Sequence, residues 1–203
     1  SFCSKCTAWK GSLGLEPSID LYISHLVNIF SSAKKILRDD GTIWVVISDS
    51  YLGSNQGYGA KGKSKSGFQD VNDGYFASSK QKPPLANYKE HAKSLALIPQ
   101  RFVLAMFNEG WIVRNEIIWK KPNCMPTSTK DRYTVDFEHL FFFSKKKKYY
   151  FNQQLEQNNR NKRTVWSINP KPFSQNHKHF ATYPEELCLS PILAGCPENG
   201  IVL

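Results

Sequence analysis

Apolar residues recur every three or four positions between Tyr22 and Leu37, which predicts an amphipathic helix. The apolar face of this helix consists of Tyr22, Leu26, Ile29, Phe30, Ala33, Ile36 and Leu37. Ser18 can cap its start, and Gly41 lies just past its end. The unbroken apolar run Thr42–Ile47 then predicts a strand buried on both faces. A helix, a tight turn and a buried strand in succession are typical of a parallel α/β sheet.

The second half of the chain also contains apolar patterns that predict helices and strands. Pro99 opens a predicted helix that Gly110 ends. Its apolar stripe consists of Phe102, Val103, Met106 and Phe107. The runs Trp111–Trp119 and Phe137–Ser144 predict two antiparallel strands at a sheet edge, joined by a long loop.

Three shorter segments follow. Thr164–Ile168 predicts a short strand, and Pro184–Ala194 predicts a helix with a proline near its start. Glu198–Leu203 is typical of a turn that enters a buried strand, because Gly200 precedes an apolar β-branched run. The 203 residues therefore predict one α/β domain that carries a long insertion.

The insertion, residues 52–93, differs from the rest in composition. It holds six glycines and seven lysines against three acids, and it has almost no apolar period. A loop of this length is functional or disordered. Its lysines alternate with the aromatic residues Tyr58, Phe68, Tyr75, Phe76 and Tyr88. Lysines for phosphates and aromatic rings for bases are typical of proteins that bind single strands or flipped bases. Disorder without a role is the alternative.

Composition narrows the function classes. The net charge of +10 favours a polyanionic partner such as nucleic acid, although a merely soluble basic protein has the same charge. No apolar run reaches about 18 residues, so we expect no membrane span, and no leader peptide is expected. Five scattered cysteines suit a reducing, cytoplasmic setting. Cys3 and Cys6 form a Cys-x-x-Cys pair without a second pair, so we expect no metal site.

The carboxyl end of the first strand carries the clearest candidate chemistry. Asp49 and Tyr51 lie just past Thr42–Ile47, and ligands of doubly wound sheets bind beyond the carboxyl ends of strands. An acid and an aromatic residue at that edge suit a nucleotide-like ligand. The equally weighted alternative is that Asp49 only caps the next turn.

Seven stretches in order resemble the permuted class of S-adenosylmethionine-dependent DNA amino-methyltransferases, which methylate cytosine N4 or adenine N6. The stretches are Leu13-Gly-Leu-Glu-Pro17, Asp40-Gly-Thr-Ile-Trp44, Ser48-Asp-Ser-Tyr51, Gly110 to Asn123, Glu138 to Lys145, Arg163-Thr-Val-Trp-Ser-Ile168 and His179 to Leu187. The resemblance implies a Rossmann-like α/β methyltransferase fold with a mostly parallel sheet and antiparallel edge strands. It also implies an incomplete domain over residues 1–203, because the family's glycine-rich donor loop would follow Leu203 and its Ser-Pro-Pro motif would precede Cys3.

The resemblance also assigns residues. The resemblance implies that Ser1 and Phe2 are remnants of the catalytic motif that holds a flipped base; the alternative is that the motif itself has been cut away. Asp49 and Tyr51 match residues at the active-site edge of the sheet in this family. The residues that flank the methyl donor S-adenosylmethionine are His179, Phe180, Ala181, Thr182 and Pro184. The expected partner is double-stranded DNA with base flipping. A catalytically inactive DNA-binding remnant is the alternative function, and the sequence does not give the oligomeric state.

DNA contacts are expected from the insertion. Lys61, Lys63 and Lys65 lie in it, and it follows the active-site edge directly, so we predict that residues 52–93 form a target-recognition or lid element. If they do not, recognition falls to the loop around Lys130 and Arg132.

Overall fold

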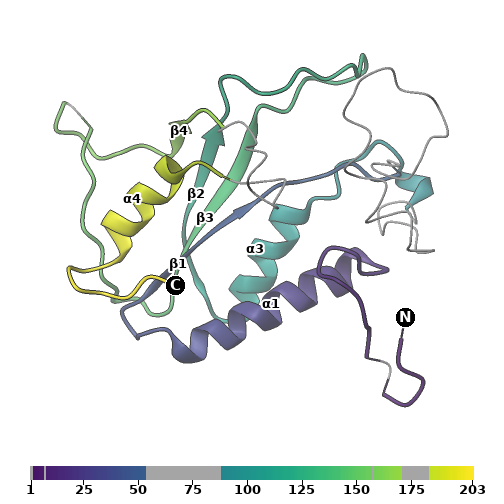
Figure 1. Cartoon of the computed structure of the whole chain (residues 1–203), viewed down its shortest axis with the longest axis horizontal. Coiled ribbons are helices and arrows are strands. Elements are labelled where there is room, and N and C mark those ends of the chain that lie inside the picture. Colours follow the sequence, from purple (N-terminus) through teal and green to yellow (C-terminus); the bar gives the residue numbers. More distant parts are fainter. Residues whose placement is uncertain (1, 7, 54–87, 157, 171–182) are drawn as a thin grey trace, which may run out of the picture. The chain divides into compact units, whose positions relative to one another are not determined.

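A computed structural model describes residues 2–6, 8–53, 88–156, 158–170 and 183–203 (Figure 1). Apart from the strand expected at the C-terminus, the predicted elements form close to their expected bounds. They are α1 (Ile19–Ile36), β1 (Thr42–Ile47), α3 (Ile98–Asn108), β2 (Ile112–Lys120), β3 (Phe137–Ser144), β4 (Val165–Ser167) and α4 (Glu185–Gly195). The structure adds a 3-10 turn that was not predicted, η2 (Lys89–His91). No helix among the described residues is long and apolar enough to cross a membrane.

The described chain divides into two compact units. The first unit contains residues 1–30 and 49–105, and the second contains residues 31–48 and 106–203. The boundaries fall within α1 and α3, so each unit holds one part of each helix.

Helix boundaries in the first unit follow the expected capping chemistry. The Ser18 hydroxyl accepts a hydrogen bond from the Leu21 N–H at 3.2 Å, which satisfies one of the free donors of the first turn of α1. The predicted cap is therefore confirmed. In α3 the predicted stripe holds only in part, because Phe102 is fully buried whereas Phe107, at the end of the helix in the second unit, is 63% exposed.

The second unit contains a four-stranded sheet in the order β1-β3-β2-β4. β1 and β2 each pair antiparallel with β3, and only β2 and β4 are parallel. The sheet is therefore mixed, and the expected majority of parallel pairs is wrong for the part that the structure describes. β2 and β3 are also its two inner strands and not edge strands, because β1 and β4 flank them.

Position in the sheet explains burial better than the apolar runs do. Leu140, Phe141, Phe142 and Phe143 of β3 are all at most 2% exposed, in line with the position of β3 between two neighbouring strands. In β1, by contrast, only Ile47 is buried, at 9% exposed. The prediction of a strand buried on both faces was wrong for β1, since it lies at the edge of the described sheet.

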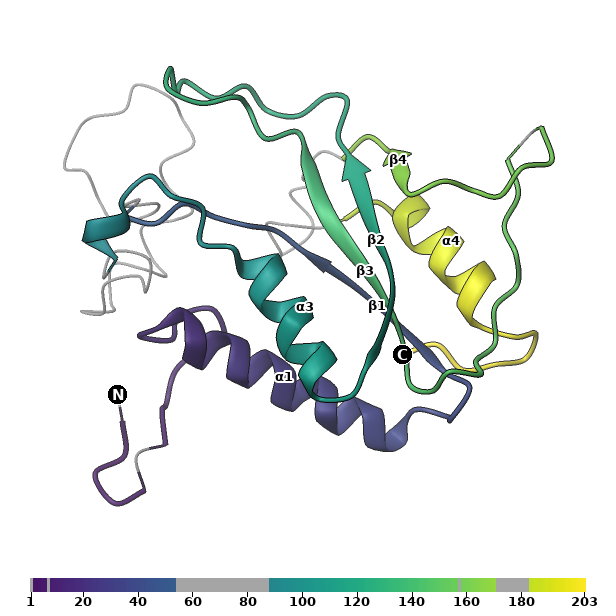
Figure 2. The same cartoon turned by 180° about the vertical axis from the view of Figure 1, so that it is seen from behind.

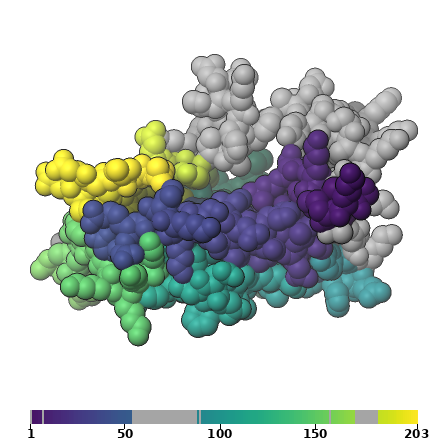
Figure 3. Space-filling model, turned by 90° about the horizontal axis from the view of Figure 1, so that it is seen from below, coloured from purple at the N-terminus to yellow at the C-terminus, as the bar shows by residue number. Residues whose placement is uncertain are grey.

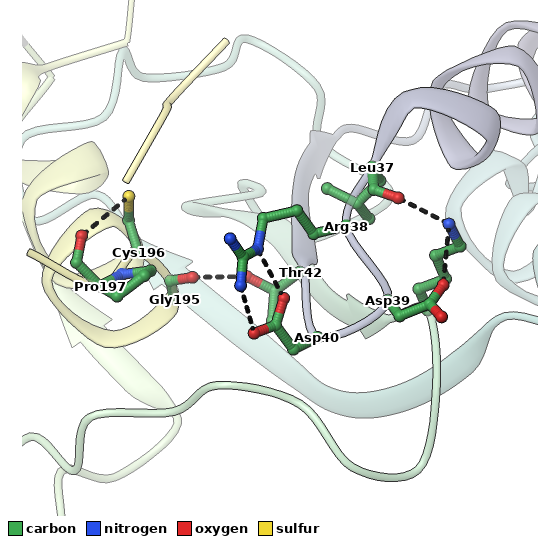
Figure 4. A network of polar contacts seen from close by, with 9 residues as sticks. Leu37, Arg38, Asp39, Asp40, Thr42, Gly195, Cys196 and Pro197 are labelled. Atoms are coloured by element: carbon green, nitrogen blue, oxygen red, sulfur yellow. Dashed lines mark hydrogen bonds and ion pairs between the residues drawn. The ribbon is translucent and has the colours of Figure 1, made fainter. Parts of the chain in front are cut away.

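Helix α4 covers one face of this sheet (Figure 2). Leu187 of α4 joins a buried cluster with Trp119 and Trp166, which also includes Ile117, Leu140 and Ile168. On the same face, Trp44 stacks on Phe142 with ring centroids 4.1 Å apart. The helix ends against the start of β1, where the Thr42 hydroxyl donates to the Gly195 carbonyl at 3.4 Å (Figure 4). In the surface view, the yellow C-terminal residues accordingly lie beside the blue segment that precedes β1 (Figure 3).

The last residues of the chain do not form the predicted strand. Ile201, Val202 and Leu203 have no regular secondary structure and are 87%, 54% and 100% exposed. An extended segment becomes a strand only when a neighbour pairs with its backbone, and no strand of the described sheet pairs with this one.

Candidate functional site

Asp49, two residues past β1, binds the start of α3. Its Oδ1 accepts hydrogen bonds from the N–H groups of Ser50 at 2.8 Å and Ile98 at 3.1 Å. Its Oδ2 accepts from the Leu97 N–H at 3.1 Å. The first N–H groups of a helix have no partner within the helix, and a negative charge there also interacts favourably with the helix dipole. The carboxylate therefore caps α3 from a site 48 residues away in the chain.

The two ends of the insertion meet directly beside this cap. Tyr51 and Leu95 form an antiparallel bridge. Three backbone hydrogen bonds of 2.8 to 3.0 Å flank it and join Ala96 N to Ser50 O, Leu52 N to Ser94 O, and Lys93 N to Leu52 O. Gly53 has a φ of +69°, and a Cβ there would lie 2.8 Å from Ala92 Cβ, so glycine is required. The chain therefore enters and leaves the insertion through one short antiparallel ladder, and the Tyr51–Leu95 bridge of this ladder lies two residues after Asp49.

Glu16 is a buried carboxylate that sequence reasoning did not assign to the site. It is 0% exposed, and its Oε2 accepts a hydrogen bond from the Gly14 N–H at 2.8 Å. Its Oε1 lies 2.9 Å from His25 Nδ1, and Trp9 stacks on the same imidazole ring at 5.7 Å. Burial raises the pKa of Tyr22, and the charge of Glu16 raises it further.

These contacts give Glu16 a clear physical role. A buried carboxylate is tolerated only when it is paired and hydrogen-bonded. Glu16 therefore ties the loop that follows Trp9 to the first turns of α1. The only sequence signal for it was its place in the Leu13–Pro17 motif, since a lone acid between two apolar residues does not reveal burial.

The N-terminal residues form a small hairpin. Phe2 bridges to Trp9, and the Cys3 N–H donates to the Ala8 carbonyl at 2.7 Å. The Phe2 ring is 57% exposed. Hydrogen bonds from the Lys5 and Cys6 backbone, and then from the Cys6 side chain, lower the pKa of the Cys3 thiol. Within the described residues, no group of three or more His, Cys, Asp or Glu side chains could hold a metal ion.

Several predicted site residues lie outside the described residues. They are Ser1, Lys61, Lys63, Lys65 and His179, Phe180, Ala181 and Thr182. Lys130 and Arg132 lie exposed in the loop between β2 and β3. Phe2, Asp49 and Tyr51 belong to the first unit, whereas Pro184, Lys130 and Arg132 belong to the second.

Pro184 is the one described member of the expected donor-binding set. It is fully buried at the start of α4, with φ −70° and ψ 145°. Proline has no N–H to donate, and its ring lies inside the fold. Pro184 therefore fits a role in setting the entry of the chain into α4 and not one of hydrogen-bonding a cofactor.

Comparison with known proteins agrees with the motif order. The family model for N6 and N4 DNA methylases matches residues 7–203. The type II methyltransferase M.Cfr9I of Citrobacter freundii is 40% identical over 94% of this chain and 62% of its own length. M.SmaI of Serratia marcescens is 37% identical over 95% of this chain and 65% of its own length. The chain thus spans a little under two thirds of the length of these two relatives.

One solved structure shows the same fold. The PvuII DNA methyltransferase, described as cytosine-N4-specific, superposes with a TM-score of 0.63 at 13% identity, over 97% of this chain and 61% of that protein. The expected α/β methyltransferase fold, present here in part, is therefore confirmed. Because the family model covers nearly every residue and the motifs occur in its order, the chain belongs to the N6 and N4 DNA methylase family.

Proposed function

We propose that the protein is a DNA methyltransferase that moves a methyl group from S-adenosylmethionine to the exocyclic amine of cytosine (N4) or adenine (N6). The observation that carries this proposal is the match of the family model over residues 7–203. The type II methyltransferases M.Cfr9I and M.SmaI, which align with more than nine tenths of the chain, support it. A DNA substrate also fits the net charge of +10.

Positioning is the main demand of this reaction. The methyl donor supplies an electrophilic methyl group, and the exocyclic amine must be held about 3–3.5 Å from it, because a misplacement of about 1 Å can cost roughly a hundredfold in rate. An amine inside a duplex is out of reach, so the target base has to leave the stack and rest against an aromatic ring. The exposed ring of Phe2 is the candidate for that contact, and Ser1 is the candidate acceptor for the amine.

In this proposal Asp49 is a positioning residue. Both of its oxygens are bound by backbone N–H groups at the start of α3, so its role is to fix the loop that follows β1. Tyr51, which bridges to Leu95, then has a defined backbone position at the foot of the insertion. His179, Phe180, Ala181 and Thr182 would flank the methyl donor, as the family motif implies.

The insertion is the proposed target-recognition or lid element. The ladder around Tyr51 and Leu95 supports this assignment, because it anchors both ends of residues 54–87 beside Asp49. Lys61, Lys63 and Lys65 would then contact DNA phosphates. Lys130 and Arg132, exposed in the loop between β2 and β3, are the proposed contacts of a second segment.

The test is the nucleoside composition of DNA from cells that express the complete protein. Mass spectrometry of the hydrolysed DNA should detect N4-methyldeoxycytidine or N6-methyldeoxyadenosine above the level of a vector control in a methylation-deficient host. The identity of the product names the target base. Unmodified DNA, combined with DNA binding by the same purified protein, would instead support the inactive DNA-binding remnant.

A further inference from the structure

The second unit contains a cavity of about 480 Å³ that the proposed reaction does not use. Its walls come from the middle of β2, from β4, from the buried side of α4, and from the segment between β3 and β4 that runs beside α4 (Figure 2). A volume of this size lies within the range of pockets that hold small molecules. Eight of its twelve lining residues have polar side chains.

One wall of the cavity is a hairpin that hydrogen bonds hold in place. Leu155 bridges to Asn161, and the Lys162 N–H donates to the Gln154 carbonyl at 2.9 Å. The Arg163 guanidinium forms a two-point contact with the Glu156 carboxylate at 3.2 and 3.3 Å. The hairpin is thus fixed at its base, and the charge of Arg163 is matched by Glu156.

Lys162 places a positive charge at this cavity. Its ammonium group lies 4.4 Å from the centre of the Trp166 ring and donates a hydrogen bond to the Ser190 hydroxyl. Burial lowers the pKa of Lys162, although the charges of Glu186 and Glu156 act in the opposite direction. No carboxylate of the described residues forms an ion pair with it. Lys162 is exposed, so its ammonium group is accessible to an anionic ligand.

The rest of the lining offers hydrogen bonds and one aromatic surface. The side-chain amides of Asn115, Gln153, Gln154 and Asn161 line the cavity. Gln153 donates to Asn161 and Gln154 donates to the Asn152 carbonyl, so each of these amides keeps only part of its hydrogen-bonding capacity for a ligand. Amides both donate and accept, and they can therefore pair with the edge of a nucleobase. Phe151 also lines it and is 47% exposed, and its ring is braced by stacking on Phe142 at 5.7 Å. An exposed, braced ring is a surface on which a base can stack.

We propose that this cavity is a nucleotide-binding site, in which Lys162 holds a phosphate, Phe151 stacks on the base, and the amides bind the base edge. The ligand is either a nucleotide of bound DNA or a free nucleotide, which present the same phosphate and base. The first source rests on the proposed DNA substrate, whereas the second does not.

The test uses the complete protein and thymidine monophosphate, whose base has no exocyclic amine to methylate. Calorimetric titration should show binding, and Lys162→Gln should weaken it about tenfold, since a hydrogen bond to a charged group is lost. Lys162→Arg keeps the charge and should restore most of the affinity. Lys147→Gln removes an exposed lysine of the same unit and should have no effect. Circular dichroism of each variant checks that the fold is kept.

Photo-crosslinking then locates the ligand and identifies its source. An oligonucleotide or a mononucleotide that contains 5-iodouracil should attach to a peptide that contains Phe151 or Trp166. Crosslinking of the oligonucleotide at this peptide supports a DNA contact, and crosslinking of the mononucleotide alone supports a free nucleotide. Equal affinity in the Lys162→Gln variant would overturn the proposal. So would binding of inorganic phosphate as tight as that of the nucleotide, or crosslinks confined to other peptides. None of these measurements requires methyl transfer, so the proposed function can fail independently.

Discussion

At the scale of single residues, two carboxylates of the first unit are bound to partners within the fold. Asp49 accepts hydrogen bonds from two backbone N–H groups at the start of α3 and from that of Ser50, and Glu16 joins the Gly14 backbone to His25. Neither carboxylate is arranged as a free acid or base. Both instead fix loops that lead into helices, and a reaction that depends on positioning requires such loops to be rigid.

Replacing Asp49 with alanine should lower the free energy of unfolding by about 1–2 kcal/mol, because the first N–H groups of α3 lose their acceptor. Asp49→Asn keeps one side-chain carbonyl and should lose roughly half as much. Urea unfolding followed by circular dichroism measures both. The control is Asp20→Ala in the same unit, where an exposed pair with Arg101 at 3.3 Å should contribute less than about 1 kcal/mol. Unchanged stability in Asp49→Ala, together with lost methyl transfer, would contradict the capping role.

The sequence located Asp49 but did not decide between its two interpretations. Its place after an apolar run predicted a residue at the end of a strand, which is correct. Its partners, Leu97 and Ile98, lie 48 and 49 residues further along the chain. The spacing of apolar residues reveals only contacts between residues that are close in the sequence. A helix cap that comes from a residue 48 positions away was therefore not predictable. The same limit hid Glu16, whose burial depends on the arrangement of Trp9 and α1.

At the scale of elements, the contact between α4 and β1 depends on Gly195. A Cβ at this position would lie 2.4 Å from Thr42 Oγ1 and 2.9 Å from Trp44 Nε1. Gly195→Ala should therefore lower the free energy of unfolding by about 1–3 kcal/mol, because α4 must shift away from β1.

A double-mutant cycle isolates the cause. Thr42→Ala removes the hydroxyl that the new methyl group would meet, so the combined variant should lose less than the sum of the two single losses. Additive losses would show that Gly195 is needed for a reason other than close approach.

Elements were more predictable than their arrangement. The spacing of apolar residues, with periods of two and about 3.6, predicted the four strands and the helices α1, α3 and α4 to within a few residues. The sheet order was not readable, because β3 inserts between β1 and β2 through pairings that follow no local pattern. The apolar run at Ile201–Leu203 likewise predicted a strand, yet a strand requires a partner as well as a suitable sequence.

At the scale of the whole molecule, the charge of +10 should dominate DNA binding. If about six phosphates are neutralised, the affinity of the complete protein should fall about a thousandfold between 50 and 200 mM salt. Neutralising Lys130 and Arg132 together should reduce the salt slope by about two ion equivalents. Fluorescence anisotropy with a labelled duplex measures this.

The control for that slope is Lys146→Gln. Lys146 pairs with Asp39 at 2.7 Å, so its charge is already matched and its loss should change the slope less. A slope that changes by the same amount per charge removed in both sets of variants would place the loop between β2 and β3 outside the DNA interface and leave only a diffuse charge effect.

In the proposed function, the protein transfers methyl groups to the exocyclic amines of DNA bases. The most direct measurement incubates the purified complete protein with duplex DNA and S-adenosylmethionine labelled in the methyl group, and then locates the label in the digested nucleosides. We predict label on the exocyclic nitrogen of cytosine or adenine, with none in a reaction that lacks protein. Label on a ring carbon, or DNA that binds the protein but stays unlabelled, would contradict the account.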